Sequence, residues 1–200
     1  MKYEMFISSI TSYYAKNNLI GESQIEAFKY GASLTFASIV SFAIAFSWGA
    51  VFNCIPEVCV FLVFFVPLRI FTGGYHASTF LRCTLSLVAI LALLTLSINY
   101  LPDVIIKPMF VLGSISFLYS VYRYSPIQHP NAPIRERDIP KFRKISLIIC
   151  ILEVSTIAFT VFNPVLIKNY RSLIITSVFS MIIGSFLIYI AKATINKTGE

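Results

Sequence analysis

Charged residues are scarce in this 200-residue chain, and their scarcity excludes a soluble globule. Asp, Glu, Lys and Arg make up only 12% of the residues, about half the roughly 25% of a soluble domain. A soluble protein of this size must cover its surface with polar groups, and this chain has too few. Hydrophobic residues make up 57% and the mean hydropathy is +0.79, which also excludes a disordered chain. The composition predicts a polytopic membrane protein.

Histidine and cysteine are scarce too. The chain has two histidines and four cysteines, with no Cys-x2-Cys pair among them. A structural zinc site takes about four such ligands, so we predict no metal. The sequence has neither a phosphate-binding glycine loop nor the signature of a serine triad, and we predict no cofactor. The cysteines do not form a disulfide framework, although a bond between Cys54 and Cys59 is permitted.

Residues 1–30 contain no apolar core of roughly 7–15 residues, so we expect no signal peptide there. They predict two short helices instead. In the first, Phe6, Ile7, Ile10 and Tyr14 recur at steps of three and four residues, a stripe that suits a helix in the membrane interface. The second begins at Ser23, where a glutamate three residues on completes a capping box.

The rest of the chain predicts an all-α bundle of about six membrane crossings within a single membrane domain. A crossing of the roughly 30 Å hydrocarbon layer takes about 20 residues. The second apolar segment is shorter, and because Arg69 and a double glycine follow it, we predict a broken crossing there. A polar loop, 123–144, separates the fourth segment from the fifth. The six segments are 31–52, 58–67, 81–101, 105–122, 145–162 and 172–191.

Basic residues are distributed unevenly between the two sides of the membrane. With the N-terminus in the cytoplasm, only Lys107, Lys168 and Arg171 of the 16 Lys and Arg residues face outside. Cytoplasmic segments of membrane proteins are enriched in basic residues, so we predict both termini and the 123–144 loop in the cytoplasm. We assign the net charge of +7 to this bias and to contact with anionic lipid, not to nucleic acid.

The segment from Arg69 to Cys83 contains the residues best suited to chemistry. A cysteine nucleophile needs a base, and the imidazole of His76 is the usual kind near neutral pH. The attacked carbonyl needs hydrogen-bond donors, which the backbone N–H groups of Gly73 and Gly74 can supply. Arg69 ends an apolar run, where it either snorkels to water or binds a substrate carboxylate or carbonyl.

The spacing of His76 and Cys83 constrains their geometry. In one continuous helix they would stand ~10.5 Å apart along the axis, too far for direct proton transfer. We therefore predict that no unbroken helix joins them, and that Ser78 or Thr79 is the N-cap of a helix containing Cys83. His76 can then fold back over Cys83. The simpler reading makes Cys83 a small apolar filler and His76 a bridge between water and lipid.

Two further sets of residues are candidates. Glu153 lies in the middle of a crossing, where a carboxyl either pairs with Arg69, orients His76, or stays protonated within the bundle. A basic cluster ends the polar loop and either attracts an acidic peptide tail or only controls topology. Its members are Arg135, Arg137, Lys141, Arg143 and Lys144.

Several of these residues form a pattern found in a known family. They are Arg69, Gly73, Gly74, His76 and Cys83, with the loop residues Tyr124-Ser-Pro126 and Asn131-Ala-Pro133-Ile134. The pattern resembles that of the accessory gene regulator B family, and the likeness covers almost the whole chain. Its His-x6-Cys core after a glycine is fairly specific. Members of that family are integral-membrane cysteine endopeptidases of Gram-positive bacteria that process the precursor of a cyclic quorum-sensing peptide.

The resemblance implies that Cys83 is the nucleophile and His76 the base, with Arg69 and Gly74 required for the site. It implies cleavage of a precursor peptide, release of its acidic C-terminal tail, and closure of an acyl thioester into a thiolactone or lactone at the cytoplasmic side of the cell membrane. A homodimer is left open. The alternative is a carrier or exporter of small peptides without covalent chemistry, since transporters also contain broken crossings and intramembrane carboxyls.

Overall fold

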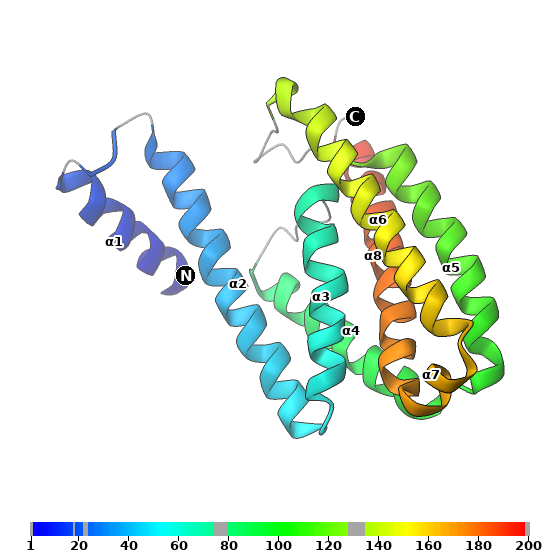
Figure 1. Ribbon diagram of the computed structural model, residues 1–200. Coiled ribbons are helices and arrows are strands. Elements are labelled where there is room, and N and C mark those ends of the chain that lie inside the picture. The colour runs from blue at the N-terminus through cyan, green and yellow to red at the C-terminus, as the bar shows by residue number, and fades with distance from the viewer. Residues whose placement is uncertain (1, 18, 22–23, 74–79, 128–134, 199–200) are drawn as a thin grey trace. The chain divides into compact units, whose positions relative to one another are not determined.

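Every element that the structure describes is a helix. The computed structural model describes residues 2–17, 19–21, 24–73, 80–127 and 135–198, and these ranges contain no β-strand. Six of the helices are long and apolar enough to cross a membrane, which confirms the predicted all-α polytopic architecture (Figure 1). The elements are α1 (Lys2–Lys16), α2 (Ile25–Val51), α3 (Ile55–Thr72), α4 (Phe80–Tyr100), α5 (Asp103–Tyr124), η2 (Glu136–Asp138), α6 (Ile139–Val161), α7 (Pro164–Asn169) and α8 (Arg171–Thr198).

Helix α3 is short, as predicted, but it is not broken at Arg69. It continues past Pro67 and through Arg69 to Thr72, giving 18 residues in one helix. Proline removes one backbone donor, but membrane helices tolerate this where neighbouring helices pack against them. The side chains on either side of the proline, Phe65 and Leu68, are buried in this way. The helix ends at Gly73, whose φ is +67°.

The polar loop between the fourth and fifth crossings is shorter than predicted. Helix α5 continues to Tyr124, and α6 begins at Ile139 after the turn η2. Pro140 at the start of α6 is a favourable first-turn residue, because its missing N–H would have no helical partner. Three basic residues assigned to the loop, Lys141, Arg143 and Lys144, therefore lie on α6. Hydropathy placed the boundary too late because these charges precede the apolar run.

The chain divides into two compact units, residues 1–45 and 46–200. In the first unit, α1 confirms a helix where the apolar stripe predicted one. Ile7 of that stripe is buried, and the ring of Tyr14 packs on Phe28 of α2 with 5.0 Å between ring centroids. Part of the stripe therefore faces α2. The capping serine predicted at Ser23 lies outside the described residues.

The second unit is built around α8. Helices α3, α4, α5 and α6 all pack against it, and Figure 1 shows α8 between the ribbons of α3 and α6. Two glycines allow this close packing. A Cβ atom on Gly184 would lie 2.7 Å from Leu68 of α3, and one on Gly113 of α5 would lie 2.9 Å from both Met181 and Ile182. Small residues at helix contacts are the usual solution in membranes, where close van der Waals packing drives association.

One end of the second unit contains α7 and is called here the α7 end. At this end Arg171, the first residue of α8, connects α8 with α4 and α5. Its Nε donates to the Asp103 carboxylate of α5 at 2.5 Å. Its terminal nitrogens donate to the carbonyl oxygens of Ile98, at 2.9 Å, and Leu101 at the C-terminal end of α4. The last carbonyls of a helix have no helical partner, so Arg171 supplies one.

Candidate active site

The residues with catalytic potential gather where α3 ends and α4 begins, at the opposite end of the second unit from α7. Arg69 lies in the last turn of α3 and is half-buried, with its guanidinium carbon 5.8 Å from the centre of the Phe65 ring. A shallow pocket beside it has a volume of about 10 Å³, enough for at most about one water. Its lining comes from Phe65, Leu68, Arg69, Thr72 and Gly73 of the α3 end and Gly184, Leu187 and Ile188 of α8.

Cys83 lies in the first turn of α4 and is half-buried. Cys83 lies within electrostatic range of the Arg69 guanidinium. The two residues come from different helices and are brought together by the fold. Two sources of positive potential therefore act at the cysteine: the side chain of Arg69 and the N-terminal end of α4, where backbone dipoles favour negative charge.

The other two members of the predicted site lie outside the described residues. His76 and Gly74 fall in the 74–79 range, as do the predicted N-caps Ser78 and Thr79. The described part of α4 begins at Phe80, three residues before Cys83. The pairing of His76 with Cys83 therefore stays a prediction.

Gly73 makes a backbone contact that the sequence did not predict. A Cβ atom at this position would lie 2.3 Å from the carbonyl oxygen of Ile127. The N–H of Ile127 donates to the carbonyl of Thr72 at 2.8 Å. Glycine is therefore required here both for its positive φ and because the backbone at Gly73 and the backbone at Ile127 approach closely. Whether its N–H also serves a substrate oxyanion stays a prediction.

A set of buried hydroxyls surrounds this contact. The Thr72 hydroxyl, 1% exposed, lies 2.9 Å from the Leu68 carbonyl and 2.8 Å from that of Gly73. Two residues before Ile127, the hydroxyl of Ser125 lies 2.8 Å from that of Ser146 on α6, and both serines are buried. Sequence reasoning missed Thr72 and Ser146. It noted Ser125 only within the Tyr124-Ser-Pro126 motif.

The predicted basic cluster is spread over the end of the second unit near Gly73. Arg135 directly precedes η2, and Arg137 lies within it, 3.9 Å from the carboxylate of Asp138. Arg143 donates to the Tyr122 carbonyl at 3.3 Å and lies over the Tyr122 ring. All five members are exposed: Arg135, Arg137, Lys141, Arg143 and Lys144.

Glu153 lies on the face of α6 that is turned into the bundle. It is 8% exposed and shares a buried stripe with Ser146, Cys150, Ile157 and Val161. Within the described residues it forms no hydrogen bond or ion pair, including with Arg69. No group of three or more His, Cys, Asp or Glu side chains that could hold a metal occurs among these residues either. The position of Glu153 therefore fits a buried bundle residue.

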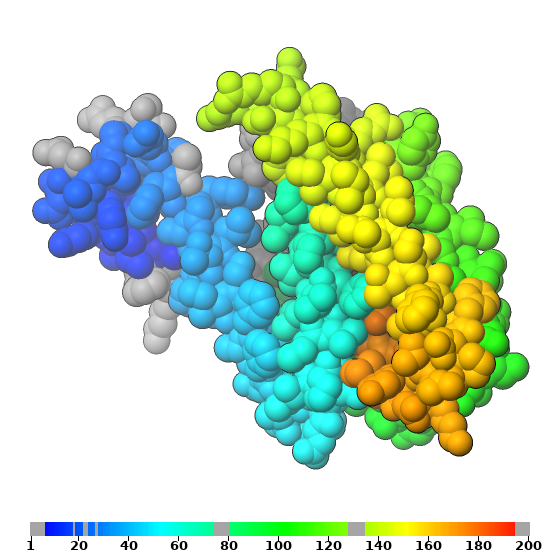
Figure 2. All heavy atoms as spheres, in the orientation of Figure 1, coloured from blue at the N-terminus to red at the C-terminus, as the bar shows by residue number. Residues whose placement is uncertain are grey.

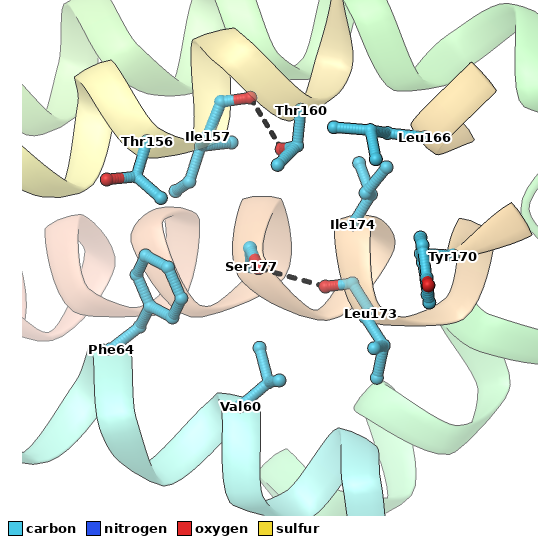
Figure 3. Close-up of a pocket in the computed structure, with 10 residues that line it drawn as sticks. All are labelled: Val60, Phe64, Thr156, Ile157, Thr160, Leu166, Tyr170, Leu173, Ile174 and Ser177. Atoms are coloured by element: carbon cyan, nitrogen blue, oxygen red, sulfur yellow. Dashed lines mark hydrogen bonds between the residues drawn. The ribbon is translucent and has the colours of Figure 1, made fainter. Parts of the chain in front are cut away.

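A cavity of the second unit that is larger than the pocket beside Arg69 lies away from Arg69 and Cys83. It has a volume of about 230 Å³ and lies between α3, α6 and α8 toward the α7 end (Figure 3). Figure 2 shows α8 at the bottom of the depression between α3 and α6. Its lining is mostly apolar and has neither a cysteine nor a histidine: Val60, Phe64, Thr156, Ile157, Thr160, Leu166, Tyr170, Leu173, Ile174 and Ser177.

The fold and this site define a multi-pass helical membrane protein with a half-buried arginine in the last turn of one crossing and a half-buried cysteine near the start of the next. The chain matches the family described as Accessory gene regulator B over residues 7–190, and it belongs to this family. It is therefore a membrane protein of accessory gene regulator quorum sensing, where the family processes a peptide precursor. No curated protein and no solved structure matches the chain.

Proposed function

We propose that the protein is a membrane cysteine endopeptidase that cleaves a small precursor peptide and promotes its cyclisation. The observation that supports this most directly is the position of Arg69, half-buried in the last turn of α3 and within electrostatic range of Cys83 on α4. An arginine in a membrane helix is costly unless its charge has a partner or a function. Membership of the Accessory gene regulator B family, which is associated with peptide processing, adds to this support.

The reaction begins with transfer of the Cys83 thiol proton to His76. The sulfur attacks the carbonyl carbon of the peptide bond, and negative charge moves to the carbonyl oxygen. Arg69 and the N-terminal end of α4 stabilise that charge, as oxyanion donors do in other acyl transfers. The carbon–nitrogen bond then breaks, and His76 returns its proton to the leaving amine of the acidic tail. A thioester between the precursor and Cys83 remains.

Ring closure is a second acyl transfer. A thiol or hydroxyl within the precursor attacks the thioester carbonyl, and Cys83 leaves as the restored nucleophile. Exchange of one thioester for another is nearly isoenergetic, so water must be kept from the intermediate. A site at the membrane boundary excludes water and holds both ends of the chain together, which makes closure unimolecular.

The basic cluster carries the charge that an acidic precursor tail would be attracted to. Arg135 and Arg137 precede α6, while Lys141, Arg143 and Lys144 lie in its first turns. We propose that these exposed charges attract the tail and that the site faces the cytoplasm of a Gram-positive cell. Because exposed charges are screened by salt, this attraction should weaken as ionic strength rises.

Tail release from the precursor tests this proposal. The purified protein in lipid vesicles is incubated with the precursor peptide encoded beside its gene, and the released tail is quantified by mass spectrometry. Wild type should release the tail, whereas Cys83→Ser and His76→Ala should lose at least about 1,000-fold in rate. Cys59→Ser removes an exposed cysteine of α3 and serves as the matched control, with wild-type activity expected. Cleavage that persists in Cys83→Ser would favour the carrier alternative.

A further inference from the structure

The segment of residues 125–127 connects three parts of the second unit. At one end the N–H of Ile127 donates to the carbonyl of Thr72, the last residue of α3. At the other end the hydroxyl of Ser125 is paired with that of Ser146, two turns beyond the start of α6. Ser125 directly follows α5. The segment therefore joins the ends of α3, α5 and α6.

Water cannot easily replace these bonds. Thr72, Ser125, Ile127 and Ser146 are all buried, with Ser146 fully so. Ser146 is itself held by the carbonyls of its own helix, at 2.8 Å from that of Phe142. Buried hydroxyls that lose their partners are costly, so each bond fixes the geometry of the next.

The end of α3 that this segment holds includes Arg69 of the proposed site. Arg69, which lies within electrostatic range of Cys83, is one turn before Thr72. Gly73 follows with a φ of +67°, and the chain leaves α3 there, three residues before His76. A shift of the Thr72–Gly73 peptide would therefore move the guanidinium and the point at which the chain leaves α3.

We propose that the 125–127 segment is a positioning element of the active site. By holding Thr72 and Gly73, it sets the place of Arg69 relative to Cys83. Ser125 and Ser146 act as positioning residues and do not touch the substrate. This inference rests on the proposed function, because it assigns the segment a role in the same acyl transfer. It also explains why a serine–proline motif far along the chain belongs with the glycine motif.

The test compares two serine pairs of the same chemistry. Ser125→Ala/Ser146→Ala removes the hydroxyl pair of the positioning segment, leaving neither partner unsatisfied. Ser116→Ala/Ser185→Ala removes a pair with the same 2.8 Å separation between α5 and α8, and among the described residues the hydroxyls of this pair form no hydrogen bond with Thr72 or with the 125–127 segment. Both double variants are compared with wild type for kcat and KM of tail release, and for resistance to unfolding by detergent.

The expected result is a loss of kcat in the first pair only. Misplacement of reacting groups by about 1 Å costs up to about 100-fold in rate, so kcat should fall by roughly 10- to 100-fold with KM changed less than about threefold. The control pair should lose similar resistance to unfolding but keep kcat within about threefold. The single variant Ser146→Thr retains a hydroxyl for Ser125 and should keep most of the wild-type kcat. Equal kcat losses in both pairs, or none in either, would overturn the proposal.

A second readout does not depend on cleavage. In a background with Cys54, Cys59 and Cys150 replaced by serine, alkylation of Cys83 by iodoacetamide is followed against pH. The first double variant should be alkylated more slowly than the control pair and should show a different pH profile. If it does not fold, the single Ser146→Ala variant is judged by the same measurements.

The failure of this inference is distinguishable from that of the proposed function. If Cys83→Ser still cleaves the precursor, the endopeptidase proposal is wrong, and only the alkylation profile judges the positioning role. If Cys83→Ser is inactive while the first double variant retains wild-type kcat and alkylation, only the positioning role is wrong.

Discussion

Replacement of Arg171 by alanine should destabilise the bundle. Arg171 donates to two carbonyl oxygens at the end of α4, those of Ile98 and Leu101, and to the carboxylate of Asp103. Hydrogen bonds from a charged group contribute about 1.5–3 kcal/mol each. The Arg171 side chain is 34% exposed and that of Asp103 63%, so we take the lower figure for each carbonyl and at most ~1 kcal/mol for the ion pair.

These contributions are offset by the entropy of ordering a long side chain. Two carbonyl bonds and the ion pair together contribute up to about 4 kcal/mol, and arginine loses up to about 2 kcal/mol of rotamer entropy when fixed. The expected loss for Arg171→Ala is therefore about 2 kcal/mol. Arg171→Lys should lose roughly half of this, because one ammonium cannot reproduce the planar fork that reaches all three acceptors.

Unfolding of the protein in mixed micelles measures the effect. The only tryptophan, Trp48, donates to Thr95 of α4 at 3.0 Å, so its fluorescence reports whether α4 is docked. The midpoint in dodecyl sulfate should move to a lower fraction for Arg171→Ala. Lys168→Ala removes an exposed charge from the neighbouring α7 and should change stability by no more than about 0.5 kcal/mol. Equal midpoints for the two variants would refute the reasoning.

Three further predictions follow from local geometry. Gly113→Ala should cost about 1–3 kcal/mol, because its Cβ would lie 2.9 Å from two α8 side chains, whereas Gly31→Ala, with open space around it, should be neutral or stabilising in the same unfolding assay. Gly73→Ala should cost about 2 kcal/mol or more, because its φ of +67° favours glycine and its Cβ would meet the Ile127 carbonyl; unchanged stability would contradict this packing. Burial, and secondarily Glu57, raise the pKa of the Cys54 thiol above 9.0, so less thiolate is present at a given pH. Cys54 should therefore be alkylated more slowly at pH 8 in folded than in detergent-unfolded protein, and the folded rate should still rise above pH 9.0.

The membrane crossings were predictable because apolar length is a local property. Errors arose where a charge stood beside an apolar run. Arg69 and the double glycine suggested a break, but α3, packed against α8, continues through Arg69 to Thr72. Lys141 was assigned to a loop although α6 begins before it. Hydropathy records where lipid is favoured, whereas a helix extends as far as its backbone bonds and caps allow.

The candidate site was predictable only in part. The pairing of His76 with Cys83 stays a prediction from residue types, and Arg69 was singled out from the cost of an arginine in a membrane helix. The contact of Gly73 with Ile127 joins residues far apart in the sequence, and no local pattern encodes such a pairing. The same holds for the pair of Ser125 and Ser146, and for Arg171, which had been counted only as a charge on the outer side. These contacts depend on tertiary packing.

The central claim is that Cys83 carries the precursor as a thioester, and detection of that intermediate tests it most directly. The protein in vesicles is mixed with precursor, quenched in acid within seconds and measured as an intact mass, with and without hydroxylamine. We predict an adduct equal to the precursor without its tail, located on Cys83, removed by hydroxylamine and absent from Cys83→Ser. Tail release without any such adduct in wild type, or an equal adduct in Cys83→Ser, would contradict the account.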